Sequence, residues 1–424
     1  MPSKTLDSLF SPPPQDIKIP SDLCPSDALI EDLIALRRDL HRHPELSWHE
    51  HRTADVISAF LTRHGIPHRK GVAGTGVVAE LPGPEGVPFV ALRADTDALP
   101  IQEKTGLPFS SERPGVMHAC GHDIHTSMLL GAAVLLKEKG ALPAPVRFIW
   151  QPAEENVEGA LAMIEAGVLD NVGAIFGGHV DCRFPVGHLV VTDGAVNAST
   201  DEFSIEVIGK EGHGARAYEA IDSVVIASHL VVALQEIVSR EIDPAQPAVL
   251  SIGEFHAGSA PNVIAGSAHL RGTIRALEEP VRRRLKTALQ RMCTGIGTLH
   301  RAKVEVHIKE GTPPVINTPG VVVTARQAAV IVGMPRSLQG ANMGGEDFAW
   351  YLQKVPGAYI RFGAGRPEGP VHPAHSGFFD PDEKSIAFGA AWFTVVALRA
   401  GRVLAGTEEE QLEVEQGDAS PGAC

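Results

Sequence analysis

Residues 118–136 constrain the fold more than any other part of the chain. They open with the octet His118-Ala119-Cys120-Gly121-His122-Asp123-Ile124-His125, which holds three imidazoles, a thiol and a carboxylate. Residues 128–136, at the end of this segment, are all apolar or glycine, which predicts a helix that is largely buried. We therefore expect the octet to lie where a loop enters the N-terminus of a core helix. Its nitrogen and sulfur donors suit Zn²⁺ or a neighbouring transition metal. So short a loop supplies three ligands at most, so the others must come from elsewhere.

Short apolar runs alternate with helical patterns on both sides of this segment. Strands are expected at residues 76–81, 88–93, 146–150 and 174–179, and helices at residues 26–41 and 50–64. Strands that alternate with helices predict an α/β fold, in which a mixed, mostly parallel sheet is sandwiched between helices.

The pattern changes near residue 197. Residues 203–208 alternate with period two, as a half-buried strand does. Further strands are expected at residues 249–255, 269–276 and 304–308, with helices at residues 223–240 and 280–294. Four strands and two helices predict an inserted α+β unit with a four-stranded antiparallel sheet.

Charge and cysteine usage exclude several classes of protein. The chain carries 51 acidic and 37 basic residues, for a net charge of −14, which argues against a nucleic-acid partner. No run reaches the roughly 18 apolar residues of a membrane span, and the N-terminal residues lack the apolar core of a secretory signal. The five cysteines are scattered and form no disulfide framework. We therefore expect a cytoplasmic protein without a membrane partner.

Three further stretches carry groups that could complete a metal site. Glu154-Glu155 follows an expected strand, His179 ends another, and the third is His372-Pro373-Ala374-His375. Open α/β sheets place their sites at the carboxyl ends of their strands. A metal lowers the pKa of a bound water from about 15.7 to about 7, and one glutamate could bind the metal while the other takes the proton. Each stretch alone fits a buried thiol, a core histidine or a solvated helix start, but all four together indicate a metal-dependent enzyme.

The chain resembles the M20 metallopeptidases, in particular the amidohydrolase branch of hippurate hydrolases, N-acyl-amino-acid amidohydrolases and plant auxin–amino-acid conjugate hydrolases. The resemblance extends over about residues 30–400. It rests on residues 37–46, 92–100, 118–123, 151–155, 178–180, 212–215, 272–275 and 344–348.

The resemblance implies a site with two divalent metal ions, Zn²⁺ or Mn²⁺. The implied ligands are Cys120, His122, Glu155, His179 and His375, and Glu154 is the implied general base. His375 is preferred to His372 because Asp382-Glu383 follows it at the offset seen in the family.

Other site residues are carried over in the same way. His213 matches a catalytic histidine that reaches a substrate carbonyl in relatives, often across a dimer, and Asn262 and Arg275 are expected to face the substrate. Asp97 and Asp123 are expected to contact metal ligands, without binding a metal themselves, and so to fix the orientation of those ligands.

The expected domain limits follow from these patterns. Residues 1–25 are expected to be loosely ordered, and residues 26–196 and 312–406 to form the two parts of a catalytic domain. Residues 197–311 would be an inserted lid through which two chains form a homodimer. Residues 407–424 carry six carboxylates and no Lys or Arg, which predicts a disordered acidic tail.

Three departures from the family pattern bear on the substrate pocket. Ala217-Tyr218 stands where relatives commonly have Pro-His, Ser223 where the lid helix usually begins with Pro, and Ile124 where the octet usually has Gly. None of these positions is an expected metal ligand.

The sequence therefore predicts a metal-dependent amidohydrolase that cleaves the amide bond of an N-acyl or N-aryl amino acid, a small molecule. A dipeptidase or carboxypeptidase that uses the same site remains open. So do a biosynthetic amide-processing enzyme and a metabolite binder without turnover on this scaffold.

Overall fold

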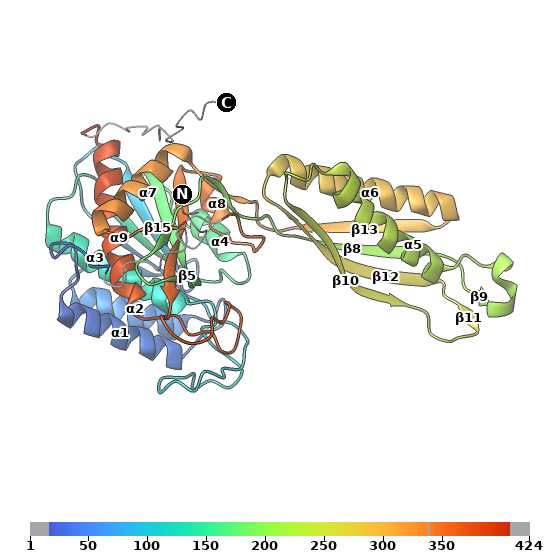
Figure 1. The fold of residues 1–424 in the computed structure, drawn as a ribbon, viewed down its shortest axis with the longest axis horizontal. Coiled ribbons are helices and arrows are strands. Elements are labelled where there is room, and N and C mark those ends of the chain that lie inside the picture. The colour runs from blue at the N-terminus through green and yellow to red at the C-terminus, as the bar shows by residue number, and fades with distance from the viewer. Residues whose placement is uncertain (1–16, 338–339, 408–424) are drawn as a thin grey trace, which may run out of the picture.

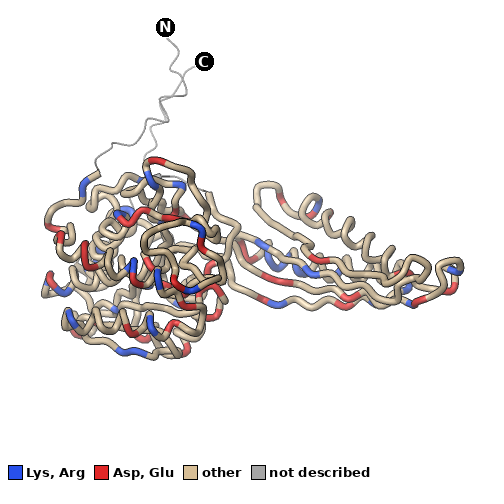
Figure 2. The backbone as a smooth tube through the Cα atoms, turned by 90° about the horizontal axis from the view of Figure 1, so that it is seen from below, with Lys and Arg blue, Asp and Glu red and all other residues tan. Residues whose placement is uncertain are grey.

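The computed structural model describes residues 17–337 and 340–407, which form two unequal parts. Figure 1 shows a larger α/β part and a thinner second part that extends away from it. Figure 2, turned by 90°, shows a narrow connection between the two, with acidic and basic residues spread over both. The predicted loosely ordered start and acidic tail fall mostly on residues 1–16 and 408–424, which lie outside the described residues.

The larger part is built on an eight-stranded mixed sheet, in which β4, β3, β5 and β16 are parallel neighbours. The strand order is β1-β2-β4-β3-β5-β16-β6-β15. The strands are β1 (His68–Val72), β2 (Gly76–Leu81), β3 (Phe89–Asp95), β4 (Val146–Gln151), β5 (Val172–Pro185), β6 (Leu189–Val190), β15 (Arg336–Ser337) and β16 (Gly357–Gly365). A small sheet pairs β7 (Gly194–Asn197) with β14 (Val315–Asn317).

Helices cover both faces of this sheet (Figure 1). They are α1 (Asp27–Arg42), α2 (His51–Arg63), α3 (His122–Lys139), α4 (Gly159–Glu165), α7 (Pro319–Val332), α8 (Ala349–Leu352) and α9 (Ser385–Leu404). Strand β4 shows how the faces are divided, because Phe148 and Trp150 pack in the cluster that contains α3 and α9, whereas Ile149 packs with α4 and α8. Successive side chains of a strand point to opposite faces. The predicted α/β class is confirmed.

Helix α3 is the core helix predicted from the apolar run. All of its residues from His122 to Leu136 are buried. Gly121 precedes the helix with a φ of 94°, and Gly140 ends it with a φ of 76°, a region that glycine enters without strain. The left-handed turn at Gly121 places Cys120 and His122 next to the carboxyl ends of β3 and β4.

The second part has its own core and a four-stranded antiparallel sheet in the order β10-β12-β8-β13. Its strands are β8 (Asp201–Ile208), β10 (Ala248–Ala257), β12 (Ser267–Ala276) and β13 (Lys303–Glu310), and its helices are α5 (Ser223–Glu236) and α6 (Glu279–His300). Helices α5 and α6 pack on one face, where Phe203, Ile205 and Val207 are buried. A short pair, β9 (Gly212–His213) with β11 (Val263–Ile264), lies at the end far from the larger part (Figure 1).

Two helical segments of the described chain, Ser223–Glu241 and Ser385–Leu404, are long and apolar enough to cross a membrane. The second is α9, and 67% of its apolar window is buried within the fold. The first packs against the sheet of the second part. Such helices are weak evidence for a membrane span, because core helices of globular proteins have the same composition.

Candidate metal centre

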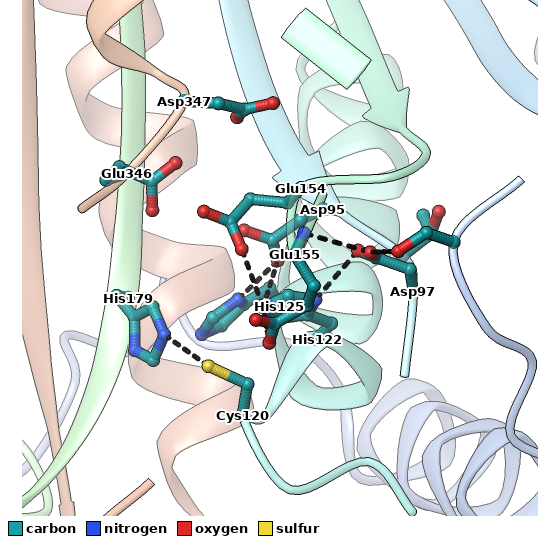
Figure 3. Close-up of polar contacts among 12 residues, drawn as sticks. Asp95, Asp97, Cys120, His122, His125, Glu154, Glu155, His179, Glu346 and Asp347 are labelled. Atoms are coloured by element: carbon teal, nitrogen blue, oxygen red, sulfur yellow. Dashed lines mark hydrogen bonds and ion pairs between the residues drawn. The ribbon is translucent and has the colours of Figure 1, made fainter. Parts of the chain in front are cut away.

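Five side chains from four segments converge at the carboxyl edge of the large sheet, and Figure 3 shows four of them, Cys120, His122, Glu155 and His179. Cys120 and His122 come from the start of α3, Glu155 follows β4, and His179 lies in β5. His375 comes from the loop between β16 and α9. The structure thus brings together all five residues that the sequence predicted as metal ligands.

Their ligand atoms lie at the spacings expected of groups that share an ion. Cys120 Sγ is 3.1 Å from His179 Nε2 and 3.5 Å from His375 Nε2. Glu155 lies 3.5 Å from His375 Nε2 through one oxygen and 3.9 Å from His122 Nε2 through the other. Metal–ligand bonds of about 2.0–2.3 Å allow atoms at such separations to bind a common cation.

Two of these atoms lack any other role in the fold. His122 Nε2 and Glu155 Oε1 are buried and have no hydrogen-bond partner among the described residues. Because a buried polar atom without a partner is costly, both atoms indicate that a further group belongs between them. Thiolate, imidazole and carboxylate donors suit a divalent transition metal, so the residues present fit the metals that the sequence predicts.

The pKa values of these side chains show which of them would have to lose a proton to bind a metal. Burial lowers the pKa of His179, together with neighbouring His125 and Arg361, and burial also lowers the pKa of His375. Both imidazoles are thereby kept neutral, as a metal ligand must be. Burial raises the pKa of the Cys120 thiol well above its usual value and that of Glu155 to about 7. Burial alone would lower the pKa of His122, but Asp95, Cys120 and Asp97 raise it well above its usual value. Metal binding would therefore release protons from Cys120, Glu155 and His122.

Asp97 links two of the predicted ligands. One of its oxygens lies 3.2 Å from His122 Nδ1, and the other accepts hydrogen bonds from the Glu155 backbone N–H at 3.0 Å and the Ser47 hydroxyl at 2.7 Å. Asp97 therefore contacts His122 and Glu155 from the side away from the other ligands' donor atoms, through a ring nitrogen and a backbone N–H. A carboxylate on the far nitrogen of a ligating histidine fixes the ring and its tautomer.

The structure does not bring Asp123 to any predicted ligand. Its carboxylate lies 2.8 Å from Arg37 Nε and 2.8 Å from His41 Nδ1 instead. It lies in the first turn of α3, on the side that packs against α1, and so faces Arg37 and His41 rather than the predicted ligands.

Asp95 is the carboxylate that the sequence reasoning missed. It lies 2.6 Å from His125 Nδ1 and 3.7 Å from His122 Nε2. His125 Nε2 in turn accepts the backbone N–H of Val180 at 2.9 Å, next to His179. The sequence did contain a signal for Asp95, because Asp95 and Asp97 both lie within residues 92–100, one of the stretches that carry the resemblance to the M20 family.

Glu154 occupies a different position from Glu155. Its carboxylate is 3.9 Å from His122 Nε2 on one side and groups with Glu346 and Asp347 on the other (Figure 3). Burial, followed by the charges of Glu346, Glu155 and Asp347, raises the pKa of Glu154. Arg93 neutralises part of this charge, at 2.8 Å from Asp347 and 3.2 Å from Glu346. A carboxyl group with a raised pKa can accept a proton and release it again.

The backbone around these groups is strained. Ala153 and Val157, on either side of the glutamate pair, have φ values of 53° and 57°, and His375 has a φ of 65°. Each non-glycine residue in this region costs of order 1–3 kcal/mol. Glu50 supports the turn by accepting the Ala153 N–H at 2.9 Å. The sequence gives no signal for these conformations.

A cavity of about 640 Å³ opens from the metal centre toward the second part. Its walls contain all of the predicted ligands except His122, together with Glu154, Arg361 and Asn197, and, from the second part, Asp201, Arg275 and Lys309. Arg275 is therefore placed where a substrate residue was expected.

His213 and Asn262 are not brought to this cavity within one chain. Both are exposed at the β9–β11 end of the second part, where Gly214 N–H donates to the Asn262 carbonyl at 2.8 Å. His372 is also remote from the ligands, because its ring stacks on Phe378 with the ring centres 5.3 Å apart, beside a separate cavity.

Comparisons with known proteins agree with this site. Residues 91–399 match the model of peptidase family M20/M25/M40. The chain is 41% identical over 372 residues to the N-acetylcysteine deacetylase of Bacillus subtilis (strain 168), covering 86% of this chain and 96% of the relative. It is 38% identical over 375 residues to IAA-amino acid hydrolase ILR1-like 5 of Arabidopsis thaliana, covering 87% and 86%. The structure of a Bacillus subtilis dinuclear metal binding peptidase from the M20 family superposes with a TM-score of 0.79 at 37% identity, covering 88% and 98%.

Proposed function

Because the chain belongs to peptidase family M20/M25/M40, we propose that it hydrolyses N-acyl or N-aryl amino acids at a site with two divalent metal ions. It is a metal-dependent amide hydrolase. The observation that carries the proposal is the pair Glu154-Glu155, in which one carboxylate lies among the metal ligands and the other faces the cavity beside them. The relatives named for N-acyl and auxin conjugates support this substrate class.

The five convergent side chains would hold the ions. When bound, these would polarise the scissile carbonyl and lower the pKa of a water molecule. The unpartnered His122 Nε2 and Glu155 Oε1 support this assignment. The thiol of Cys120 favours Zn²⁺, whereas the carboxylate and imidazoles also accept Mn²⁺, so either ion is proposed.

Glu154 would move the proton. As a carboxylate it accepts a proton from the attacking water, and its surroundings of Glu346 and Asp347 favour the protonated form that results. The same carboxyl group then donates this proton to the nitrogen of the leaving amino acid. One residue thus serves as base and then as acid, as a raised pKa allows.

A second copy of the chain would complete the site. His213 and Asn262 are exposed and do not line the cavity of their own chain. His213 lies in β9 and Asn262 directly precedes β11, and Figure 1 shows these strands at the end of the second part that is far from the larger part. We propose that His213 of one chain donates a hydrogen bond to the substrate carbonyl bound by its partner, where negative charge develops. Exposed Val225 and Val232 on α5 and Phe255 on the edge strand β10 support a homodimer through this part.

The proposed compartment is the cytoplasm. Cys24, Cys120, Cys182 and Cys293 are free thiols, and free thiols persist in a reducing compartment.

Metal quantitation combined with a panel of amides tests the proposal. We expect two ions per chain and faster hydrolysis of N-acetyl and aryl-acyl amino acids than of dipeptides, with activity lost on chelation. A preference for dipeptides would contradict the substrate class. Two bound ions without hydrolysis of any amide would contradict the enzymatic role.

A further inference from the structure

Arg361 differs from the other buried arginines in its partners. Arg37, Arg93, Arg147 and Arg282 each lie within 2.5–2.8 Å of a carboxylate. Arg361 on β16 is only 8% exposed, and among the described residues its guanidinium contacts a neutral group, the amide oxygen of Asn197, at 2.7 Å from Nη2. A buried charge is costly unless an opposite charge accompanies it. The fold therefore leaves Arg361 without the counter-charge that each of the others has.

Its position connects Arg361 to the reaction. In the sheet it stands opposite His179, since β16 pairs with β5 in parallel register, and it lines the same cavity as the predicted ligands. Asn197 holds it there, because the Asn197 amide group donates to the carbonyls of Gly344 and Gly345 at 3.1 and 3.3 Å and so keeps its oxygen turned toward Arg361. The guanidinium is thus fixed in place before any ligand arrives.

The acidic residues of the cavity wall already have other partners. Asp201 pairs with Arg282 at 2.7 Å, Glu310 with Lys286 at 2.8 Å and Glu346 with Arg93 at 3.2 Å. Glu154 and Glu155 belong to the metal centre. Glu202 lies 3.9 Å from Arg271, and Glu158 accepts a hydrogen bond from Trp48 at 3.2 Å. No carboxylate of the described cavity wall therefore forms an ion pair with Arg361.

Arg275 is a second cation of the same cavity, and it comes from the opposite wall. It lies on β12 of the second part and is half-buried, and the charges of Asp201 and Glu202 act on it although neither forms an ion pair with it among the described residues. Arg361 and Arg275 come from opposite parts of the fold and neither forms an ion pair among the described residues, so the cavity offers two guanidinium groups to anionic groups of one ligand. Arginine binds carboxylates through two parallel hydrogen bonds.

We propose that Arg361 binds a second carboxylate of the substrate, while Arg275 takes the α-carboxylate that every N-acyl amino acid has. The preferred substrates would then be diacids. This inference rests on the proposed function. The second carboxylate can come from an acidic acyl group, such as succinyl, or from an acidic amino acid, such as glutamate, and the chemistry that Arg361 recognises is the same in both.

The test compares kcat/KM for N-acetylalanine, N-succinylalanine and N-acetylglutamate. The wild-type enzyme should prefer at least one diacid to N-acetylalanine. Arg361→Gln should lower kcat/KM for that diacid at least tenfold more than for N-acetylalanine, and the diacid that responds identifies the source of the carboxylate. Arg275→Gln is the matched control and should lower kcat/KM for all three substrates by a similar factor.

A second variant leaves the arginine in place. Asn197→Asp puts a carboxylate against Arg361, and this internal counter-charge should reduce the preference for the diacid as Arg361→Gln does, with metal content unchanged. Equal effects of Arg361→Gln on all three substrates, or a wild-type enzyme slower on both diacids than on N-acetylalanine, would overturn the inference. Failure of the wild-type enzyme on all three substrates, with two ions bound, would instead overturn the proposed function.

Discussion

Buried charges in the larger part join segments that are distant in sequence. Arg37 and Arg38 of α1 both contact Glu383, before α9, and Arg37 also contacts Asp123 of α3. His41 continues this network, with Asp123 at 2.8 Å from its Nδ1 and Glu103 at 3.4 Å from its Nε2. These contacts hold α1 against α3, the helix that begins at His122 directly after Cys120 and Gly121. They therefore stabilise the metal centre although none of them involves a predicted metal ligand.

The Glu103 contacts predict a pH-dependent contribution to stability. Partial burial alone would raise the pKa of Glu103, but hydrogen bonds from His41, the Ser111 N–H and Thr105 lower it to about 2. A carboxylate whose folded pKa is depressed stabilises the fold above its unfolded pKa of about 4.3, and this contribution is lost as the pH falls toward 2. We expect Glu103→Gln to lower the urea midpoint at pH 6, and the deficit to shrink at pH 3.5. A deficit of equal size at both pH values would contradict this account.

The residues alone indicated a metal site, the resemblance to a known family implied its donor set, and the pairing of donors had to come from the structure. Cys120, His122 and Glu155 stood out in the sequence as unusual groups next to apolar runs. Nothing in the sequence distinguishes Asp95 from Asp123 as a partner, because the choice depends on which face of α3 packs against α1. Arg361 lies in a largely apolar strand, and the sequence did not indicate a role for it. Its lack of a carboxylate partner depends on three-dimensional packing, which the sequence does not show.

At the scale of elements, the geometry of the site depends on how α3 begins. Strand β2 has the predicted limits 76–81, and β4 extends the predicted strand by one residue, because apolar runs bounded by turn residues mark buried strands. The left-handed entry at Gly121 was not predictable in this way, and neither were the strained turns at Ala153 and His375. Such turns are fixed by contacts with distant segments, such as Glu50 on Ala153.

The two ends of α3 offer a matched test of that entry. A Cβ at Gly121 would lie 2.5 Å from Val180 Cγ2, whereas a Cβ at Gly140 would have no atom within 4 Å. Both substitutions to Ala place a side chain in a sparsely populated backbone region at positive φ, at a cost of about 1–3 kcal/mol each. We expect Gly140→Ala to lose only stability, and Gly121→Ala to lose bound metal as well. The test is the metal content of both variants after dialysis. Full occupancy of the metal centre in Gly121→Ala would contradict the importance of this turn.

At the scale of the whole molecule, one chain separates groups that we propose act together in the reaction. The cavity with Glu154 is lined by residues of both parts, whereas His213 lies in β9, which Figure 1 shows at the far end of the second part. A two-fold dimer exchanges the same surface between its subunits, so each second part can reach toward the partner's cavity. The strand β10 at the sheet edge, with Phe255 42% exposed, provides an unpaired surface for such contact.

Mixing two inactive variants tests this exchange. Glu154→Gln removes the base of its own site, and His213→Ala removes the donor it lends to its partner. In a two-fold dimer with random exchange of subunits, about a quarter of all sites would regain both groups. We expect activity to recover to that level after the variants are mixed and refolded together. No recovery, although each variant alone forms dimers, would show that His213 does not act across the dimer.

The separate roles of the adjacent glutamates are the central claim, and metal content measured beside kcat tests them most directly. Glu154→Gln should retain two ions per chain and lose about 100- to 10,000-fold in kcat on an N-acyl amino acid, the usual contribution of a positioned general base. Glu155→Gln, the matched neighbour, should lose bound metal together with activity. If Glu154→Gln instead turned over at the wild-type rate, or lost its metal as Glu155→Gln does, the assignment of Glu154 as the proton carrier would be wrong.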